Sequence, residues 1–83
     1  MSYIINLSRM IEDLTQEIGQ GEKYINTCVE IGDYTHAEQY RVVLILLEQA
    51  KNKIMKELEN TQNMYSVIQR KLYERKYSTH SYT

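Results

Sequence analysis

Apolar residues recur at alternating steps of four and three along most of this chain, and no proline interrupts them. In a helix of about 3.6 residues per turn, such steps keep the side chains on one side. The first series is Leu7, Ile11, Leu14, Ile18, Gly21, Ile25 and Cys28. The second is Ala37, Tyr40, Leu44, Leu47, Lys51, Ile54, Leu58, Thr61, Tyr65, Ile68 and Leu72. The spacing therefore predicts an all-α chain with coiled-coil-like seams.

Turn signals divide the pattern into two long helices, expected at about 3–31 and 36–77. Gly32 is a natural residue to end the first helix, because it tolerates the left-handed conformation found there. Thr35 and Glu38 have the spacing of a capping box for the second helix. These signals predict an antiparallel helical hairpin.

Two glycines, Gly19 and Gly21, weaken the first helix. Each costs roughly 0.5–1 kcal/mol relative to alanine in a helix interior. The sequence therefore allows either a continuous helix or one broken near residues 19–21. Gly21 lies on the apolar seam, where the missing side chain also lets another helix or a ligand approach closely.

Six consecutive apolar residues, Val42 to Leu47, point in every direction from the second helix, so one partner helix cannot cover them. That helix, about 60 Å long, must also extend beyond the first, about 40 Å long. Both features predict that a single domain, residues 1–77, assembles into an oligomeric helical bundle, with a frayed tail at 78–83. The expected oligomer interface comprises Val43, Leu44, Leu47, Ile54, Tyr65, Ile68 and Leu72.

Charge is divided unevenly along the chain, although the net value is only −1. Residues 1–49 hold three basic and eight acidic residues (3 − 8 = −5), and residues 50–83 hold seven basic and three acidic ones (7 − 3 = +4). This division favours antiparallel or offset self-association and leaves a positive end for an anion. With one cysteine, Cys28, and no apolar run of membrane-spanning length, the expected location is cytoplasmic, in a host cell if the protein is viral.

No motif for catalysis, a metal ion or a cofactor is present, so we expect a protein that is not an enzyme. His36 and His80 lack neighbouring ligands at metal-binding spacing, and Cys28 is expected to be a small core residue. Residues 70–77 mix basic residues with tyrosines, as nucleic-acid-binding surfaces do. Basic residues also stabilise a helix C-terminus, which is the structural explanation for the same pattern.

Anion binding by an oligomer is a further hypothesis. Tyrosines lie close in sequence to Arg9, Lys23 and Arg41, and an assembly could gather such residues from several chains. A planar base would stack on a tyrosine ring while a phosphate met lysine or arginine.

One set of residues resembles the phage anti-CBASS sponge family, whose members sequester cyclic oligonucleotide signals. The resemblance covers roughly residues 14–58 and rests on Glu17-Ile18, Gly21, Cys28, Glu30, Ala37, Arg41, Leu47 and Met55. It implies two antiparallel helices after a short N-terminal helix, assembled as a homo-oligomer with ligand pockets between protomers. It also implies that a cyclic di- or trinucleotide is held without hydrolysis.

The resemblance implies three ligand-binding residues. Tyr3 falls near an aromatic position on which the family stacks a base, and Arg41 matches an arginine early in the second long helix. The family lysine that follows the Glu-Ile pair has no counterpart at residues 19–21, so Lys23 is a displaced substitute. This departure, and the longer and more basic second helix, affect the ligand that is expected.

The leading functional hypothesis is thus a viral binding protein that sequesters cyclic oligonucleotides to counter host immune signalling. Two alternatives stay open. One is a helical interaction protein or inhibitor that binds a host protein through its second helix. The other is a nucleic-acid-binding protein that contacts nucleic acid through its basic C-terminal end.

Overall fold

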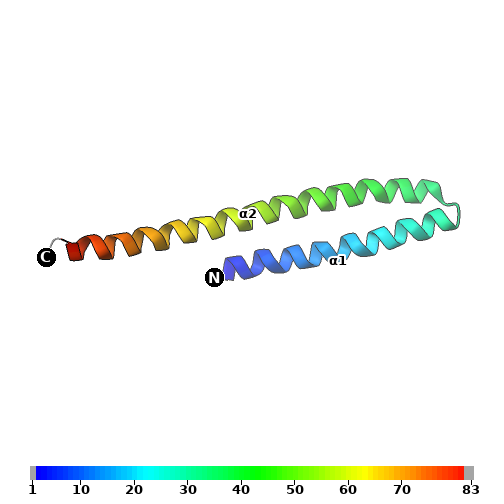
Figure 1. Cartoon of the computed structure of the whole chain (residues 1–83). Coiled ribbons are helices and arrows are strands. Elements are labelled where there is room, and N and C mark those ends of the chain that lie inside the picture. The colour runs from blue at the N-terminus through cyan, green and yellow to red at the C-terminus, as the bar shows by residue number, and fades with distance from the viewer. Residues whose placement is uncertain (1, 82–83) are drawn as a thin grey trace.

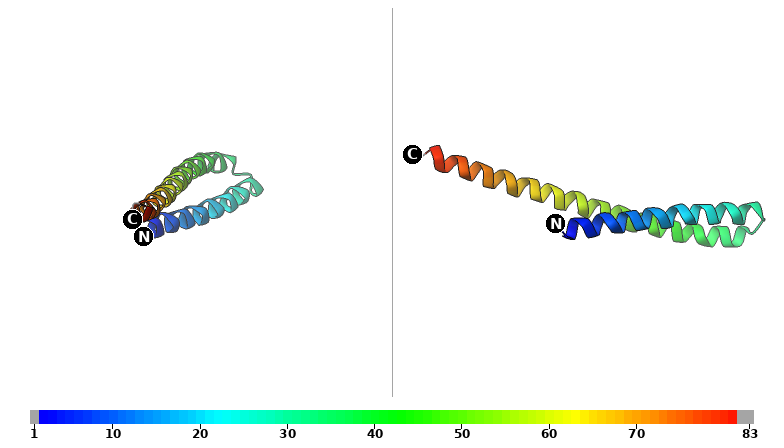
Figure 2. Two further views of the ribbon diagram at one scale, coloured as in Figure 1. Left: turned by 60° about the vertical axis from the view of Figure 1, so that its left-hand side comes forward. Right: turned by 90° about the horizontal axis from the view of Figure 1, so that it is seen from below.

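Two antiparallel α-helices make up the computed structural model, which describes the backbone of residues 2–81 and the side chains of residues 2–75. Helix α1 spans Ser2–Glu30 and helix α2 spans Tyr34–Ser81. They lie side by side in Figure 1, and both Figure 1 and Figure 2 show them joined by a tight turn at one end. The hairpin measures 78 × 16 × 15 Å. The predicted all-α helical hairpin is confirmed.

Gly32 ends α1 as the sequence predicts. Its φ is +82°, a left-handed conformation that costs other residues about 1–2 kcal/mol. Its N–H donates to the Val29 carbonyl over 3.1 Å, and the N–H of Asp33 donates to the Cys28 carbonyl over 2.8 Å. This pair of hydrogen bonds is a Schellman motif, which satisfies carbonyls that the end of the helix leaves open.

The start of α2 differs from the prediction. Asp33, and not Thr35, caps the helix: the N–H of His36 donates to Asp33 Oδ1 over 3.3 Å, and the N–H of Ala37 donates to the Asp33 carbonyl over 3.2 Å. Thr35 already lies within the first turn of α2. The predicted capping box is wrong because aspartate caps a helix at least as well as threonine and stands directly after the glycine turn.

Helix α1 is continuous through Gly19 and Gly21, so the break that the two glycines allowed does not occur. Gly21 is buried, and a Cβ atom built on it would lie 2.6 Å from both Leu44 Cδ2 and Tyr40 Cε1. The predicted close approach at Gly21 is therefore confirmed, and the approaching element is α2 of the same chain. Packing across this site offsets the low helix propensity of glycine.

The core between the helices is narrow. Within residues 2–75, the buried hydrophobic side chains are Leu7, Ile18, Cys28, Ala37 and Leu44. At the turn end, the rings of Tyr24 and Tyr40 pack edge to face with their centroids 5.0 Å apart. At the open end, the Tyr3 hydroxyl donates to Glu57 Oε1 over 3.0 Å. These contacts define the stretch of α2 that α1 covers.

Beyond this stretch α2 continues alone. Thr61 is the last partly covered residue, and the side chains of residues 62–75 are all exposed. We call residues 62–81 the overhang; at about 1.5 Å per residue it is about 30 Å long. Helix α2 extends through Ser81, four residues into the expected tail, and residues 82–83 lie outside the described part.

Candidate functional site

The three predicted ligand-binding residues do not meet within one chain. Tyr3 and Lys23 are separated along α1 by about 30 Å, the rise of twenty helical residues. Tyr3 contacts Glu57 at the end of the hairpin opposite the turn. Arg41 lies at the level of Gly21, much closer to the turn, since the neighbouring residues Tyr40 and Leu44 pack on Gly21. A site that used Tyr3 together with Lys23 and Arg41 would therefore need a second chain.

Tyr3 is exposed, and its hydroxyl is engaged as a hydrogen-bond donor. The hydrogen bond to Glu57 raises the pKa of Tyr3, and partial desolvation and the negative charge of Glu57 raise this pKa further. The phenol is thus neutral at physiological pH. One face of its ring is the kind of surface on which a planar group could stack.

Arg41 lines two adjoining hollows between the helices near the turn. One, of about 300 Å³, is formed by Ile25, Val29, Tyr34, Ala37, Glu38 and Arg41. The other, of about 390 Å³, is formed by Ile25, Arg41, Leu44, Ile45 and Glu48. Each hollow combines an apolar floor with one cation and one carboxylate. Lys23 lines neither of them.

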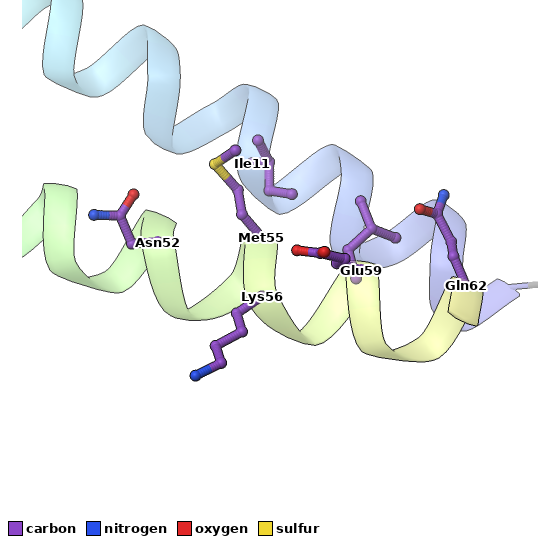
Figure 3. A pocket seen from close by; sticks show the side chains of 7 residues that line it. Ile11, Asn52, Met55, Lys56, Glu59 and Gln62 are labelled. Carbon is purple, nitrogen blue, oxygen red and sulfur yellow. The ribbon is translucent and has the colours of Figure 1, made fainter. Parts of the chain in front are cut away.

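A larger hollow, of about 520 Å³, lies toward the open end of the hairpin. Figure 3 shows Ile11 of α1 and Met55 of α2 close together at its centre, with polar side chains around them. The lining residues are Ile11, Asn52, Met55, Lys56, Leu58, Glu59 and Gln62. The mixture of one lysine, one glutamate and two amides offers hydrogen bonds but no concentrated charge.

Reactive side chains do not cluster in the described part of the chain. No group of three or more metal-ligating residues occurs there. Cys28 is buried on the core side of α1, as predicted, and its side-chain hydrogen bond is the main cause that raises the pKa of Tyr24. The His36 Nδ1 atom lies 2.7 Å from Asp33 Oδ2, an arrangement that belongs to the helix cap. The side chain of His80 lies outside the described residues.

The most extensive chemical feature is an apolar face on α2 that α1 leaves partly or fully uncovered. Residues 18 apart lie on the same side of a helix after about five full turns, and apolar residues recur at this spacing. We call the following set, which is apolar except for Thr61, the outer face of α2: Val43, Leu46, Leu47, Ala50, Ile54, Thr61, Met64, Tyr65, Ile68 and Leu72. Leu46 and Leu72 are each 60% exposed, and Ile68 is 48% exposed.

Most of the predicted interface residues belong to this face. Val43, Tyr65, Ile68 and Leu72 are exposed, and Leu47 and Ile54 are half-buried at the edge of α1. Leu44 is different: it is only 7% exposed and packs on Gly21 within its own hairpin. As predicted, one helix does not cover the apolar run, since Val42, Val43, Ile45 and Leu46 stay exposed.

Sequence reasoning missed three members of the outer face, Leu46, Ala50 and Met64. All three lie off the single four-and-three seam that runs through Leu44, Leu47 and Tyr65. The signal is the 18-residue spacing from Leu46 to Met64, which repeats from Val43 to Thr61 and from Ala50 to Ile68.

Comparisons with protein-family models, with curated proteins and with solved structures found no match to this chain. Within the described residues, neither helix is long and apolar enough to cross a membrane.

Proposed function

We propose that this chain is a non-enzymatic helical interaction protein whose binding surface is the outer face of α2. One observation carries the proposal: the overhang keeps apolar residues at helical spacing, including Tyr65, Ile68 and Leu72, although α1 does not cover them. A helix that is solvated on all sides needs no such stripe. Burying one leucine or isoleucine from an exposed position contributes about 1.5–3 kcal/mol, so this row can supply much of the free energy of binding a helix.

The mode of binding that fits this surface is helix against helix. The outer face is long, narrow and convex, and it offers anchors at three- and four-residue steps rather than an enclosed pocket. A partner would present its own apolar stripe along the axis of α2. Basic residues of the overhang, such as Arg70 and Lys71, would favour an acidic flank on that partner.

Photocrosslinking tests this proposal: the chain is expressed in its native cell with a photoreactive phenylalanine analogue at position 68. We expect a covalent adduct of discrete mass when the probe replaces Ile68 and none when it replaces Asn63, an exposed residue on the other side of the overhang. Adducts with a second copy and adducts with another protein are distinguished by mass. The absence of an adduct at position 68 would contradict the proposal.

A second candidate is the sequestering of a cyclic oligonucleotide, which the resemblance to the sponge family implies. The observation that favours it is the hollow lined by Arg41 and the exposed Tyr34 together with the apolar residues Ile25 and Val29. A base could stack there while the guanidinium met a phosphate. Glu38 and Glu48 line the same region and would repel the phosphates, so this candidate stands second.

Thermal denaturation with cyclic di- and trinucleotides tests the second candidate. A ligand that binds the folded state raises the melting temperature by mass action. We expect the rise to disappear in Arg41→Gln and to persist in Arg70→Gln, which removes a cation far from the hollow. No rise with any cyclic nucleotide would refute this candidate and leave the first proposal intact.

A further inference from the structure

We infer that the partner on the outer face of α2 is a second copy of this chain, aligned antiparallel over the length of α2. The inference rests on the proposed function, because it names the occupant of the surface proposed there. It places the overhang of each copy beside the first half of α2 in the other copy. The outer-face residues of the apolar run, Val43, Leu46 and Leu47, then lie against the overhang of the other copy.

The spacing of the outer face is symmetric about the centre of α2. The helix runs from Tyr34 to Ser81, so its midpoint lies between Glu57 and Leu58. In an antiparallel pair centred there, residue numbers at the same level add up to 115 (34 + 81). Eight residues of the outer face meet in this register: Val43 with Leu72, Leu47 with Ile68, Ala50 with Tyr65, and Ile54 with Thr61. Three of these four rows join two apolar side chains, and the fourth joins Ile54 to Thr61. The other two residues of the outer face, Leu46 and Met64, come level with Gln69 and Lys51.

Charge selects the same orientation. Residues 1–49 carry a formal charge of −5 and residues 50–83 carry +4 (3 − 8 and 7 − 3). A parallel pair would place each basic end beside the other, whereas the antiparallel pair places it beside the acidic half. Lys71 of one copy comes level with Leu44 of the other (71 + 44 = 115). Leu44 packs on Gly21 of α1, and Glu17 lies one helical turn from Gly21 in the same helix. Along the axis, the register therefore brings the basic Lys71 within about one helical turn of the acidic Glu17.

An acidic residue, Glu57, lies at the midpoint of α2 and therefore near the centre of the pair. Its carboxylate already accepts the hydrogen bond from Tyr3. Lys53 lies one turn before Glu57 on α2. The two glutamates near the two-fold axis are thus each provided with a donor and a neighbouring cation.

The extent of contact favours this register over pairing of the overhangs alone. Two overhangs would overlap along about 20 Å over residues 62–75, and the basic residues would gather in that short overlap. The full antiparallel pair extends from Val43 to Leu72, about 45 Å at 1.5 Å per residue. Stable dimers bury roughly 1,200–2,000 Å² in total, so the longer overlap is the one that approaches this range.

Sedimentation equilibrium of the purified chain at tens of micromolar tests the occupant. We expect a dimer for the native chain and for Gln49→Glu, and a monomer for Leu46→Glu. Both variants add one negative charge at an exposed site of the same helix, but only Leu46 belongs to the outer face. Circular dichroism confirms that both variants keep their helices. A monomeric native chain, or a Leu46→Glu variant that remains dimeric, would overturn the inference.

Disulfide trapping tests the register. In a Cys28→Ser background, Val43→Cys and Leu72→Cys chains are refolded together and oxidised. A disulfide requires Cα atoms within about 7 Å, so we expect a linked dimer in the mixture and little in either variant alone. Linked dimers in the separate samples would indicate parallel pairing. Preferential linking of a Tyr65→Cys and Leu72→Cys mixture would indicate pairing of the overhangs alone, and either result would overturn this register.

Sedimentation equilibrium and the photoreactive probe at position 68 together distinguish failure of this inference from failure of the proposed function. If the native chain is monomeric but the probe at position 68 forms an adduct with another protein, the second copy is excluded while α2 remains the binding surface. If neither a dimer nor an adduct forms, both proposals fail.

Discussion

The two glycines of α1 provide a matched pair of substitutions. Gly19 and Gly21 lie two residues apart in one continuous helix, but their surroundings differ. A Cβ atom on Gly19 meets nothing within 4 Å, whereas one on Gly21 would lie 2.6 Å from Leu44 Cδ2 and from Tyr40 Cε1. The same change to alanine should therefore have opposite effects on the free energy of unfolding.

The magnitudes follow from two terms. Replacing an interior helical glycine with alanine contributes about 0.8–1 kcal/mol of stability through helix propensity. At Gly21 the added methyl also displaces its neighbours, and overpacking of this kind costs about 1–3 kcal/mol. Leu44 is buried and the ring of Tyr40 packs on Tyr24, so neither moves freely.

We expect Gly19→Ala to stabilise the hairpin by about 0.5–1 kcal/mol and Gly21→Ala to destabilise it by up to about 2 kcal/mol. Urea unfolding followed by far-ultraviolet circular dichroism measures both, at one fixed protein concentration because association shifts apparent stability. Equal stabilisation by the two substitutions would refute the close approach of α2 at Gly21.

Three further predictions concern the turn and the core. Gly32→Ala should destabilise the chain by about 1–2 kcal/mol, the cost of the left-handed conformation for a residue with a side chain, as measured by urea unfolding. The backbone N–H of His36, and then its ring, hold the pKa of Asp33 below its ordinary value; the carboxylate therefore stabilises the fold above about pH 4, and this contribution is lost as the pH falls through the lowered pKa. Asp33→Asn keeps a capping oxygen without the titration, so its melting temperature should vary less than that of the native chain below about pH 4. Leu44→Asp should unfold the hairpin itself, with loss of the helical dichroism signal even at high protein concentration, because Leu44 is buried within one chain; a well-folded monomeric variant would show that Leu44 serves the assembly instead.

The sequence predicted the parts of the fold that depend on local chemistry. Spacing at three and four residues located both helices, and the conformational freedom of Gly32 located the turn. The cap was assigned to the wrong residue because Asp33 and Thr35 are both good caps, and only the backbone path decides between them. Continuity at Gly19 could not be read from propensity, since packing of the whole helix on α2 overrides a local cost.

The candidate site was less accessible to sequence reasoning. A seam pattern identifies which residues avoid water, but it does not say whether they are covered by their own chain or by another. Leu44 and Leu72 lie on the same predicted seam, yet one is 7% exposed and the other 60%. The difference arises because α1 packs on Leu44 but does not cover Leu72, and the residue type at the two positions is the same.

The tight turn at Gly32 and Asp33 has a consequence for how the molecule opens. Contacts near it join residues close in sequence, such as the Cys28 carbonyl and the Asp33 amide, whereas Tyr3 and Glu57 at the far end are 54 positions apart. Closing a longer stretch of chain loses more entropy. The two helices should therefore separate first at the open end, where α1 begins. Within the paired helices, backbone amides should exchange with deuterium fastest at that end and slowest beside the turn.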